Sequence, residues 1–218
     1  GLIDHKDVLE MVRACELHDT AAMIRVPNVD EEKIKKALDM GASGILVAGV
    51  HSYEDAVNAV KFAKFKPMGE RGACPAVRAN HFGLDDQVAY YEKQNQETVV
   101  FVALEGPEVV ASIDQIAQID GIDIIGVGPV DMALALGVPG QMDAPIVREA
   151  IANVKKTANA HGKLYASFSN HITDFINTEE QADFYMVAGD TWLIDDMLKK
   201  VREDLDRLRA KDAERSRL

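Results

Sequence analysis

The chain has 218 residues and a net charge of −12, because 36 acidic residues outnumber 24 basic ones along its length. This length suits one α/β domain, and the acidic balance argues against nucleic acid or an anionic membrane surface as a partner. Two cysteines without metal-type spacing, no visible signal peptide and no apolar stretch long enough to span a bilayer together predict a cytoplasmic protein.

In the first part of the chain, helical and strand-like patterns alternate at the spacing that is typical of a parallel α/β protein. The predicted elements are a helix over residues 6–17, a strand over 21–26, a helix over 31–40 that ends at Gly41, a strand over 43–47 and a helix over 52–65. Arg25 lies near the end of the first strand. A charged residue inside a strand usually marks a site, and a structural salt bridge at the sheet rim is the alternative.

The stretch over residues 67–75 is too rich in glycine and proline to form a long strand. It predicts a very short strand near residue 71 and a long loop that carries Arg71, Arg78 and His81. Side chains of this kind bind substrate carboxylates or form surface salt bridges, and the sequence leaves both alternatives open. A polar helix over residues 83–96 follows.

Two apolar runs organise the middle of the chain. Residues 99–104 end at Glu105, and residues 122–127 end in Gly128-Pro129-Val130-Asp131. Between them, residues 108–119 carry apolar side chains mostly three or four positions apart, which is helical spacing. The pattern predicts two buried parallel strands, each with an acid at or just beyond its carboxyl end.

The last part of the chain continues the alternation. The predicted elements are a helical turn over residues 130–136, a loop over 137–144, a helix over 145–161, a strand over 164–168, a helix around 172–176, a strand over 184–187 and an amphipathic helix over 191–208. The charged residues 210–218 are expected to fray.

The number and order of the strands predict the architecture. Seven strands lie near residues 21, 43, 71, 99, 122, 164 and 184, and a helix precedes the first of them. The simplest completion is a (β/α)₈ barrel, a single domain over residues 1–218, whose first strand lies upstream of Gly1. An open doubly wound sheet is the competing architecture. It normally brings an early glycine-rich nucleotide loop, and the sequence has neither a GxGxxG nor a Walker pattern.

A barrel would bring Arg25, Glu105 and Asp131 to one face, because all three lie at the carboxyl ends of strands. Two carboxylates suit Mg²⁺, Mn²⁺ or a similar cation that binds a small bidentate substrate, and a guanidinium stabilises developing negative charge. The N–H groups of Val130 and Asp131 would receive a carboxylate, whereas Pro129 has no N–H to offer. Together, the two carboxylates, the guanidinium and the two backbone N–H groups predict enolate chemistry on a 2-oxo acid. The alternative is that both acids are strand-end caps or salt-bridge partners.

Several motifs resemble the HpcH/HpaI family, the metal-dependent class II pyruvate aldolases related to 4-hydroxy-2-oxoheptanedioate and 2-dehydro-3-deoxyglucarate aldolases. The resemblance covers almost the whole chain. Its motifs are Arg25-Val26-Pro27, residues 34–47, Gly69-Glu70-Arg71-Gly72, Leu104-Glu105, Gly121-Ile122-Asp123, residues 126–132 and Ala188-Gly189-Asp190-Thr191.

The resemblance implies a (β/α)₈ barrel of the phosphoenolpyruvate/pyruvate type and a role for each site residue. Glu105 and Asp131 would ligate a divalent metal, Mg²⁺ or Mn²⁺ with Co²⁺ or Zn²⁺ as alternatives, and Arg25 would stabilise the enolate oxygen of pyruvate. The Gly128-Pro129-Val130 turn would hold the pyruvate carboxylate. The implied reaction is reversible cleavage of a 4-hydroxy-2-oxo acid to pyruvate and an aldehyde, through a pyruvate enolate bound to the metal.

The family pattern also implies features at both ends of the chain. Its members commonly form hexamers, as trimers of dimers that exchange the last helix, and residues 191–208 would fill that role. Its acid/base His aligns immediately before Gly1, so we expect either that the chain is part of a longer enzyme or that it lacks this proton shuttle. Many members have Gln where this chain has Ala103, a change that enlarges the pocket and predicts a different acceptor aldehyde.

The remaining candidates and rival functions are less specific. Phe168 and Val187, at late strand ends, would line the aldehyde pocket, with core packing as the alternative role. The other singled-out histidines receive no role; they are His51, His81, His161 and His171. The rival functions are a malyl- or citramalyl-CoA lyase or a decarboxylase of the same superfamily, and a non-catalytic barrel that binds a 2-oxo acid.

Overall fold

The computed structural model describes residues 4–169, 171–177 and 181–215. The chain divides into two compact units, Gly1–Ala166 and Ser167–Leu218, which are described separately. The described helices include none that is both long and apolar enough to cross a membrane. Cys15 and Cys74 are both free thiols.

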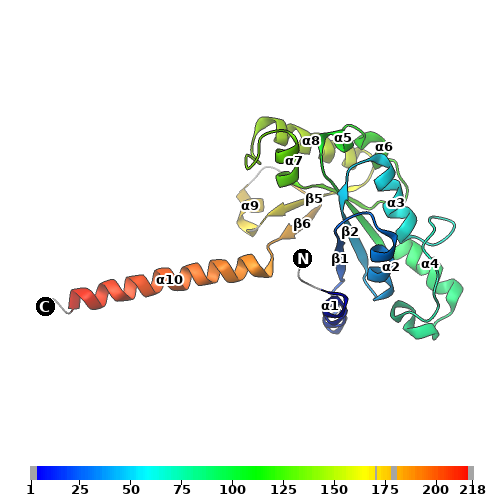
Figure 1. Cartoon of the computed structure of the whole chain (residues 1–218), viewed down its shortest axis with the longest axis horizontal. Coiled ribbons are helices and arrows are strands. Elements are labelled where there is room, and N and C mark those ends of the chain that lie inside the picture. The colour runs from blue at the N-terminus through cyan, green and yellow to red at the C-terminus, as the bar shows by residue number, and fades with distance from the viewer. Residues whose placement is uncertain (1–3, 170, 178–180, 216–218) are drawn as a thin grey trace. The chain divides into compact units, whose positions relative to one another are not determined.

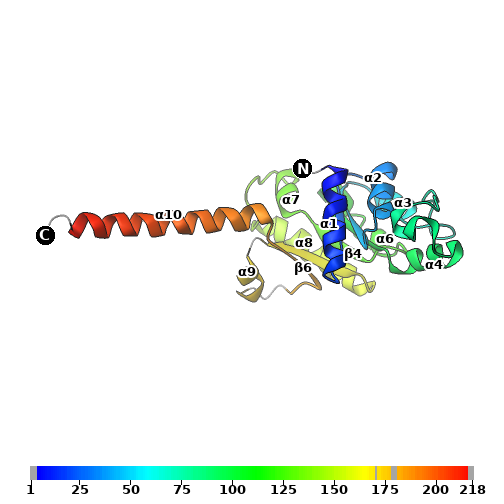
Figure 2. The same cartoon turned by 90° about the horizontal axis from the view of Figure 1, so that it is seen from below.

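The first unit alternates strands with helices, as Figure 1 shows from blue to yellow-green. Its strands are β1 (Met23–Val26), β2 (Gly44–Val50), β3 (Val99–Leu104), β4 (Ile124–Val127) and the start of β5 (Leu164–Ser169). Its helices are α1 (His5–Leu17), α2 (Glu31–Asp39), α3 (Tyr53–Ala63), the 3₁₀ turn η1 (Arg78–Gly83), α4 (Gln87–Glu97), α5 (Pro107–Val110), α6 (Ile113–Ala117), α7 (Pro129–Ala135) and α8 (Pro145–Ala160). Figure 2 shows α1 along its full length.

The strands form a parallel sheet, and this confirms the predicted α/β class. The pairings β1–β2, β2–β3, β3–β4 and β4–β5 are all parallel, and the sheet order over the described residues is β1-β2-β3-β4-β5-β6. In an unbroken parallel sheet the carboxyl ends of all strands meet at the same edge. The turns that follow β1, β2, β3 and β4 therefore lie along one edge of the first unit.

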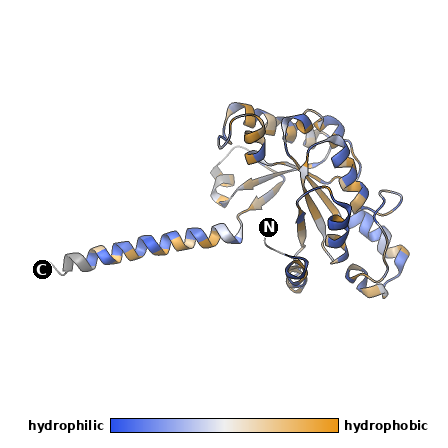
Figure 3. Ribbon diagram, in the orientation of Figure 1, coloured by the Kyte–Doolittle hydropathy of each residue, from blue (hydrophilic) through white to orange (hydrophobic). Residues whose placement is uncertain are grey.

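The two faces of this sheet differ in what covers them. Helices α2, α3, α6 and α8 line one face, and the strands carry the apolar residues that they bury (Figures 1 and 3). One row of paired residues is fully buried; it consists of Val26, Val47, Val102, Ile125 and Tyr165. The adjacent row, which faces the opposite way, starts at the exposed Arg25 and ends at Leu164, which is 45% exposed.

Capping residues set the boundaries of α2 and α3. Asp30 Oδ1 accepts a hydrogen bond from the Lys33 N–H at 3.0 Å and begins α2, and Ser52 Oγ accepts one from the Asp55 N–H at 3.1 Å and begins α3. Gly41 follows α2 with φ +101°, a left-handed conformation that glycine adopts without a steric penalty.

The predicted strand near residue 71 is wrong, because the backbone there folds onto the end of α3. The N–H of Glu70 donates to the Lys61 carbonyl at 2.6 Å, and that of Arg71 donates to the Lys64 carbonyl at 2.9 Å. These bonds occupy donors that a strand would use in the sheet. The segment is a loop that closes the carboxyl end of α3.

The second unit contains the end of β5, α9 (Ile172–Asn177), β6 (Phe184–Val187) and α10 (Asp190–Arg215). The Phe168 and Trp192 rings lie 5.6 Å apart, and the Ala188 N–H donates to the Ser169 carbonyl at 2.8 Å. Residues 210–215 continue α10, and the expected fraying of the tail stays a prediction. Lys, Glu, Arg and Ala are strong helix formers, so a charged segment extends a helix readily. Residues 216–218 lie outside the described part.

Candidate active site

Three residues singled out in the sequence point to one side of the sheet, opposite the side that α2, α3, α6 and α8 line. Register pairs Arg25 with Leu46 and Leu46 with Phe101, so Arg25 and Phe101 point to the same side. Ala103 and Glu105 follow Phe101 at alternate positions and share that side, because successive side chains of a strand alternate. The fold therefore directs Arg25, Ala103 and Glu105 toward one space.

Glu105 is a half-buried carboxylate at the carboxyl end of β3. Its main-chain N–H donates to the Val50 carbonyl at 3.0 Å, which extends the hydrogen bonding between β2 and β3 by one residue. Its side chain is 19% exposed. Within the described residues the side-chain carboxylate accepts no hydrogen bond, and the one basic group near it is the His51 imidazole. Among the described residues, a carboxylate with so few partners is a candidate ligand for a cation.

Asp131 and the preceding turn lie beside Glu105 in the sheet. Leu104 pairs with Val127, so Glu105 and Gly128 are the next residues along two adjacent strands. Gly128 precedes α7, Pro129 is its first residue, and Asp131 lies in its first turn. Asp131 Oδ2 is 3.1 Å from the position that a β-carbon on Gly128 would take. The carboxylate thus folds back over the end of β4.

The N–H groups of Val130 and Asp131 belong to the first turn of α7, where helical donors have no partner within the helix. Val130 is 60% exposed, so this turn is open to solvent. Pro129 offers no donor but has the φ angle that a first helical residue requires. The turn therefore presents two backbone donors beside the Asp131 carboxylate.

Arg25 is exposed and has no carboxylate partner among the residues that the structure describes. Structural arginines are normally held by an acid or by carbonyl groups, as Arg71 and Arg78 are here. Arg71 Nη2 donates to Asp39 Oδ1 at 2.8 Å, and Arg78 Nη1 donates to Glu16 Oε1 at 2.8 Å. These bonds assign structural roles to Arg71 and Arg78 and leave Arg25 available for a ligand.

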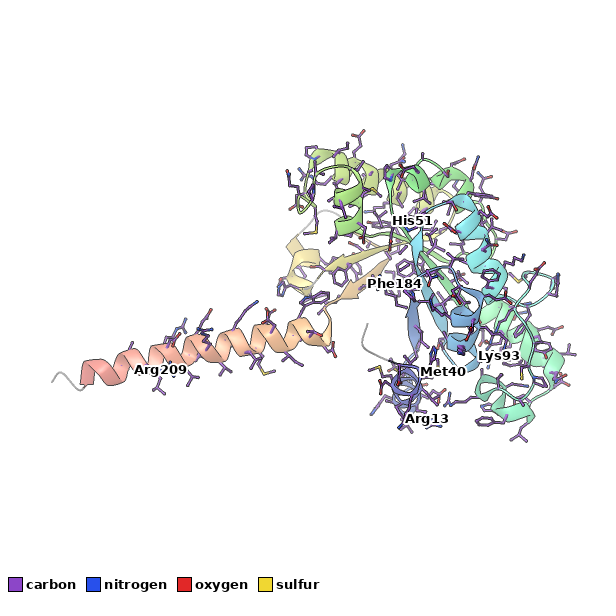
Figure 4. The ribbon with its side chains drawn as sticks, viewed as in Figure 1. Arg13, Met40, His51, Lys93, Phe184 and Arg209 are labelled. Carbon is purple, nitrogen blue, oxygen red and sulfur yellow. The ribbon has the colours of Figure 1, made fainter. Side chains whose placement is uncertain are left out.

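His81 also has a structural partner, because its Nδ1 lies 2.8 Å from Asp85 Oδ2 on the surface. His51 is different, and sequence reasoning missed it. It follows β2, its Nδ1 lies 2.8 Å from the Glu105 carbonyl oxygen, and its Nε2 lies 4.0 Å from Glu105 Oε2. The signal that could have found it is its place just beyond the second strand (Figure 4), because the next strand in the sheet ends at Glu105.

Phe168 and Val187 lie in the second unit. Phe168 is 38% exposed and contacts Trp192, and Val187 at the end of β6 is 41% exposed. Their predicted contact with an aldehyde stays a prediction.

The donor set fits a hard divalent cation held by few protein ligands. Residues 4–169, 171–177 and 181–215 contain no group of three or more His, Cys, Asp and Glu side chains already placed around a metal. Cations such as Mg²⁺ commonly take one or two carboxylates and fill their other positions with water and substrate. Glu105 is partly buried and, within the described residues, meets no basic side chain other than the His51 imidazole, so its chemistry fits such an ion.

Comparison with known proteins identifies the family. The profile of the HpcH/HpaI aldolase/citrate lyase family matches residues 4–190. The chain belongs to this family. Among curated relatives, the 5-keto-4-deoxy-D-glucarate aldolases of Enterobacter sp. (strain 638) and Shigella boydii serotype 18 are 38% and 37% identical over 144 residues. That stretch is 66% of this chain and 56% and 55% of those proteins, so the chain spans about half the length of these relatives.

Solved structures of the HpcH/HpaI family share this fold. An HpcH/HpaI aldolase from Desulfitobacterium hafniense is 25% identical to this chain, with a TM-score of 0.87. The match covers 94% of this chain and 80% of the aldolase chain. An HpcH/HpaI aldolase/citrate lyase family protein from Burkholderia cenocepacia is 28% identical with a TM-score of 0.84, at 94% and 81% coverage. The parallel α/β arrangement is therefore that of the HpcH/HpaI family.

Proposed function

We propose that this HpcH/HpaI protein is a metal-dependent class II aldolase, a carbon–carbon lyase that cleaves a 4-hydroxy-2-oxo acid reversibly to pyruvate and an aldehyde. The observation that carries the proposal is the half-buried Glu105 carboxylate on the same sheet face as Arg25. Among the described residues, His51 is the one basic group recorded against Glu105, and Arg25 has no acidic partner. Membership of a family that contains named aldolases supports it.

Glu105 and Asp131 would hold the divalent cation, Mg²⁺ or Mn²⁺. The cation, when bound, supplies a Lewis acid for the 2-oxo group of the substrate. In cleavage, the bond between C3 and C4 breaks, the C4 hydroxyl loses its proton to become the aldehyde, and C3 becomes the enolate carbon that is then protonated to pyruvate. The Arg25 guanidinium would stabilise the negative charge that develops on the enolate oxygen.

The substrate carboxylate would bind at the Gly128-Pro129-Val130 turn, where the N–H groups of Val130 and Asp131 are free of intrahelical partners. The aldehyde half would lie toward Ala103, whose small side chain leaves room on the same face. The relatives' names point to sugar acids related to 5-keto-4-deoxy-D-glucarate as the first substrates to test.

We infer that the parallel sheet forms part of a single-domain (β/α)₈ barrel. The similarity to HpcH/HpaI structures over 94% of the chain supports this inference, and so does the layer of helices on one face of the sheet.

The protein would assemble as a homo-oligomer through α10, as a hexamer built from dimers. Along this helix of 26 residues, exposed apolar side chains recur at alternating intervals of four and three; they are Ile194, Leu198, Val201, Leu205 and Leu208 (Figure 3). This spacing is that of a helix which packs against another helix.

A retro-aldol assay tests the function directly. A panel of 4-hydroxy-2-oxo acids, with 5-keto-4-deoxy-D-glucarate among them, is incubated with the protein and Mn²⁺ or Mg²⁺, and released pyruvate is measured with a coupled dehydrogenase. We expect pyruvate release that stops on chelation and returns on addition of metal. Cleavage that persists in excess chelator would contradict the proposal.

A further inference from the structure

The register of β2 against β3 changes by one residue just before His51. Val47 pairs with Val102, but Val50 pairs with Leu104, so three steps along β2 match two along β3. Gly49 lies in this bulge with φ +65°, and a β-carbon there would lie 3.2 Å from the Pro27 carbonyl oxygen. Without the bulge, residue 50 would stand opposite Glu105. The extra residue places His51 there instead, and bulges of this kind often direct a side chain into a site.

The contact of His51 with Glu105 determines which ring nitrogen carries the proton. Nδ1 lies 2.8 Å from the Glu105 main-chain carbonyl oxygen. A carbonyl oxygen only accepts hydrogen bonds, so Nδ1 is the donor. In the neutral imidazole the lone pair then belongs to Nε2. Metal-ligating histidines show this arrangement, in which one nitrogen donates to a carbonyl or carboxylate and the other binds the metal.

The Nε2 atom faces the Glu105 carboxylate at a distance of 4.0 Å from Oε2. This is too long for a hydrogen bond. Two ligands that each lie about 2.1 Å from one metal ion are separated by roughly 3 to 4 Å, and the observed spacing falls in that range. The separation of Nε2 and the carboxylate therefore leaves room for a shared cation.

Hydrogen bonds at the start of α3 hold the backbone at His51. The His51 N–H donates to Asp55 Oδ2 at 3.0 Å, and the Asp55 N–H donates to Ser52 Oγ at 3.1 Å at the start of α3. His161, by contrast, contacts an acid directly, with its Nε2 3.0 Å from Asp114 Oδ1. Of these two histidines, His51 is the one whose Nε2 has no hydrogen-bonding partner among the described residues.

We propose that His51 is a third protein ligand, through Nε2, of the cation that Glu105 and Asp131 bind. The proposal rests on the function proposed above and adds a metal ligand to it. The Asp131 carboxylate, exposed in the first turn of α7, would be the other acidic ligand. An imidazole ligand favours Mn²⁺, Co²⁺ or Zn²⁺ over Mg²⁺, so it also implies a metal preference for this protein.

Mn²⁺ alone tests the proposal without any turnover. Binding is followed by the loss of the free-ion EPR signal, and pulsed EPR detects coupling between bound Mn²⁺ and a coordinated imidazole nitrogen. His51→Gln is compared with His161→Gln, a histidine change on the amino-terminal side of β5 that leaves Glu105 untouched. Because His51 is 64% exposed, the variant should keep its fold, which circular dichroism and thermal unfolding check.

The proposal predicts nitrogen coupling in the parent protein and in His161→Gln, no coupling in His51→Gln, and a Kd for Mn²⁺ raised at least about tenfold in His51→Gln. Coupling that persists in His51→Gln, or Mn²⁺ binding that needs Glu105 but is unchanged in His51→Gln, would overturn it and leave the two-carboxylate site standing. Mn²⁺ binding that is unchanged in Glu105→Ala would overturn the proposed metal site itself.

Discussion

Asp131 folds back over Gly128, with its Oδ2 3.1 Å from the position that a β-carbon on Gly128 would occupy. Glycine at this point leaves room for the carboxylate beside the end of β4. Gly128 has φ −76°, an angle that any residue adopts, so its role is the space that it leaves rather than backbone freedom.

Gly128→Ala should therefore displace the Asp131 carboxylate by a few tenths of an ångström without unfolding the chain. We expect the Kd for Mn²⁺ to rise about tenfold, by analogy with other changes that reorient a metal ligand. The measurement is a Mn²⁺ titration. Gly72→Ala is the control, since a β-carbon there meets the flexible Lys35 side chain in a loop at 3.3 Å. Equal affinity in both variants would show that Asp131 does not ligate the cation.

Arg25→Lys keeps the positive charge but removes the planar set of donors that a guanidinium offers. Because Arg25 is exposed and has no partner among the described residues, stability should change by less than about 0.5 kcal/mol. Retro-aldol turnover should fall about 100-fold, which is typical when a group that stabilises an oxyanion is lost. Steady-state kinetics and thermal unfolding measure the two effects. Turnover equal to that of the parent would remove Arg25 from the site.

Arg71 should affect stability rather than catalysis. Its side chain is fully buried, bonded to Asp39 and placed 4.5 Å from the centre of the Phe65 ring. Arg71→Met should lower the free energy of unfolding by about 3 kcal/mol, because the partly buried Asp39 loses a charged partner. Urea titration measures the loss.

The control for Arg71 is Arg13→Met, which breaks the exposed pair with Glu10 and should cost less than about 1 kcal/mol. A stable but inactive Arg71→Met protein would contradict the structural assignment and return Arg71 to the list of substrate-binding residues.

The Glu16–Arg78 pair predicts a dependence of stability on acid. The hydrogen bond from Arg78 lowers the pKa of Glu16, and the positive charge of Arg78 lowers it further. Partial burial acts in the opposite direction and raises this pKa. The pair therefore contributes stability above about pH 4.3, the pKa expected in the unfolded chain, and this contribution is lost as pH falls through the depressed folded-state pKa. Because Glu16 is half exposed, the contribution should stay below about 1 kcal/mol.

The measurement for this pair is the free energy of unfolding of the parent and of Glu16→Gln between pH 7 and 3. The difference between the two proteins should be constant near neutral pH and shrink toward acid. A difference that grows as the pH falls would contradict the assignment.

The oligomer prediction concerns the apolar stripe of α10. Leu198→Asp places a charge in the stripe, and Lys200→Asp places the same residue on the opposite side of the helix. If α10 packs against another subunit, Leu198→Asp should yield smaller particles in light scattering after size-exclusion chromatography, whereas Lys200→Asp should not. Identical masses for both variants would exclude this stripe as the interface.

Local signals in the sequence predicted much of the fold. Asp30, Ser52 and Gly41 mark helix ends where the structure has them, since capping depends on residues close in sequence. The helix predicted over residues 108–119 is instead two short helices, Pro107–Val110 and Ile113–Ala117. Apolar spacing alone does not reveal such a break.

The features that the sequence did not predict depend on contacts between residues that are far apart in the sequence. The loop near residue 71 binds carbonyl groups of α3, which no local pattern encodes. His51 meets Glu105 because β2 contains a bulge, and bulges arise from the pairing of two strands. Glu105, Arg25 and Ala103 were easier to place, because each follows the alternation of its own strand. Their combined chemistry stays a prediction until it is measured.

The most direct test of the central claim is exchange of deuterium into the methyl group of pyruvate in D₂O, followed by NMR with Mn²⁺, with Mg²⁺ and with chelator. The account predicts exchange that requires metal and disappears in Glu105→Ala, because the carboxylate holds the cation that makes the methyl protons acidic. Pyruvate that binds to the metal-loaded protein without exchanging would contradict enolate chemistry and favour a non-catalytic protein that binds a 2-oxo acid.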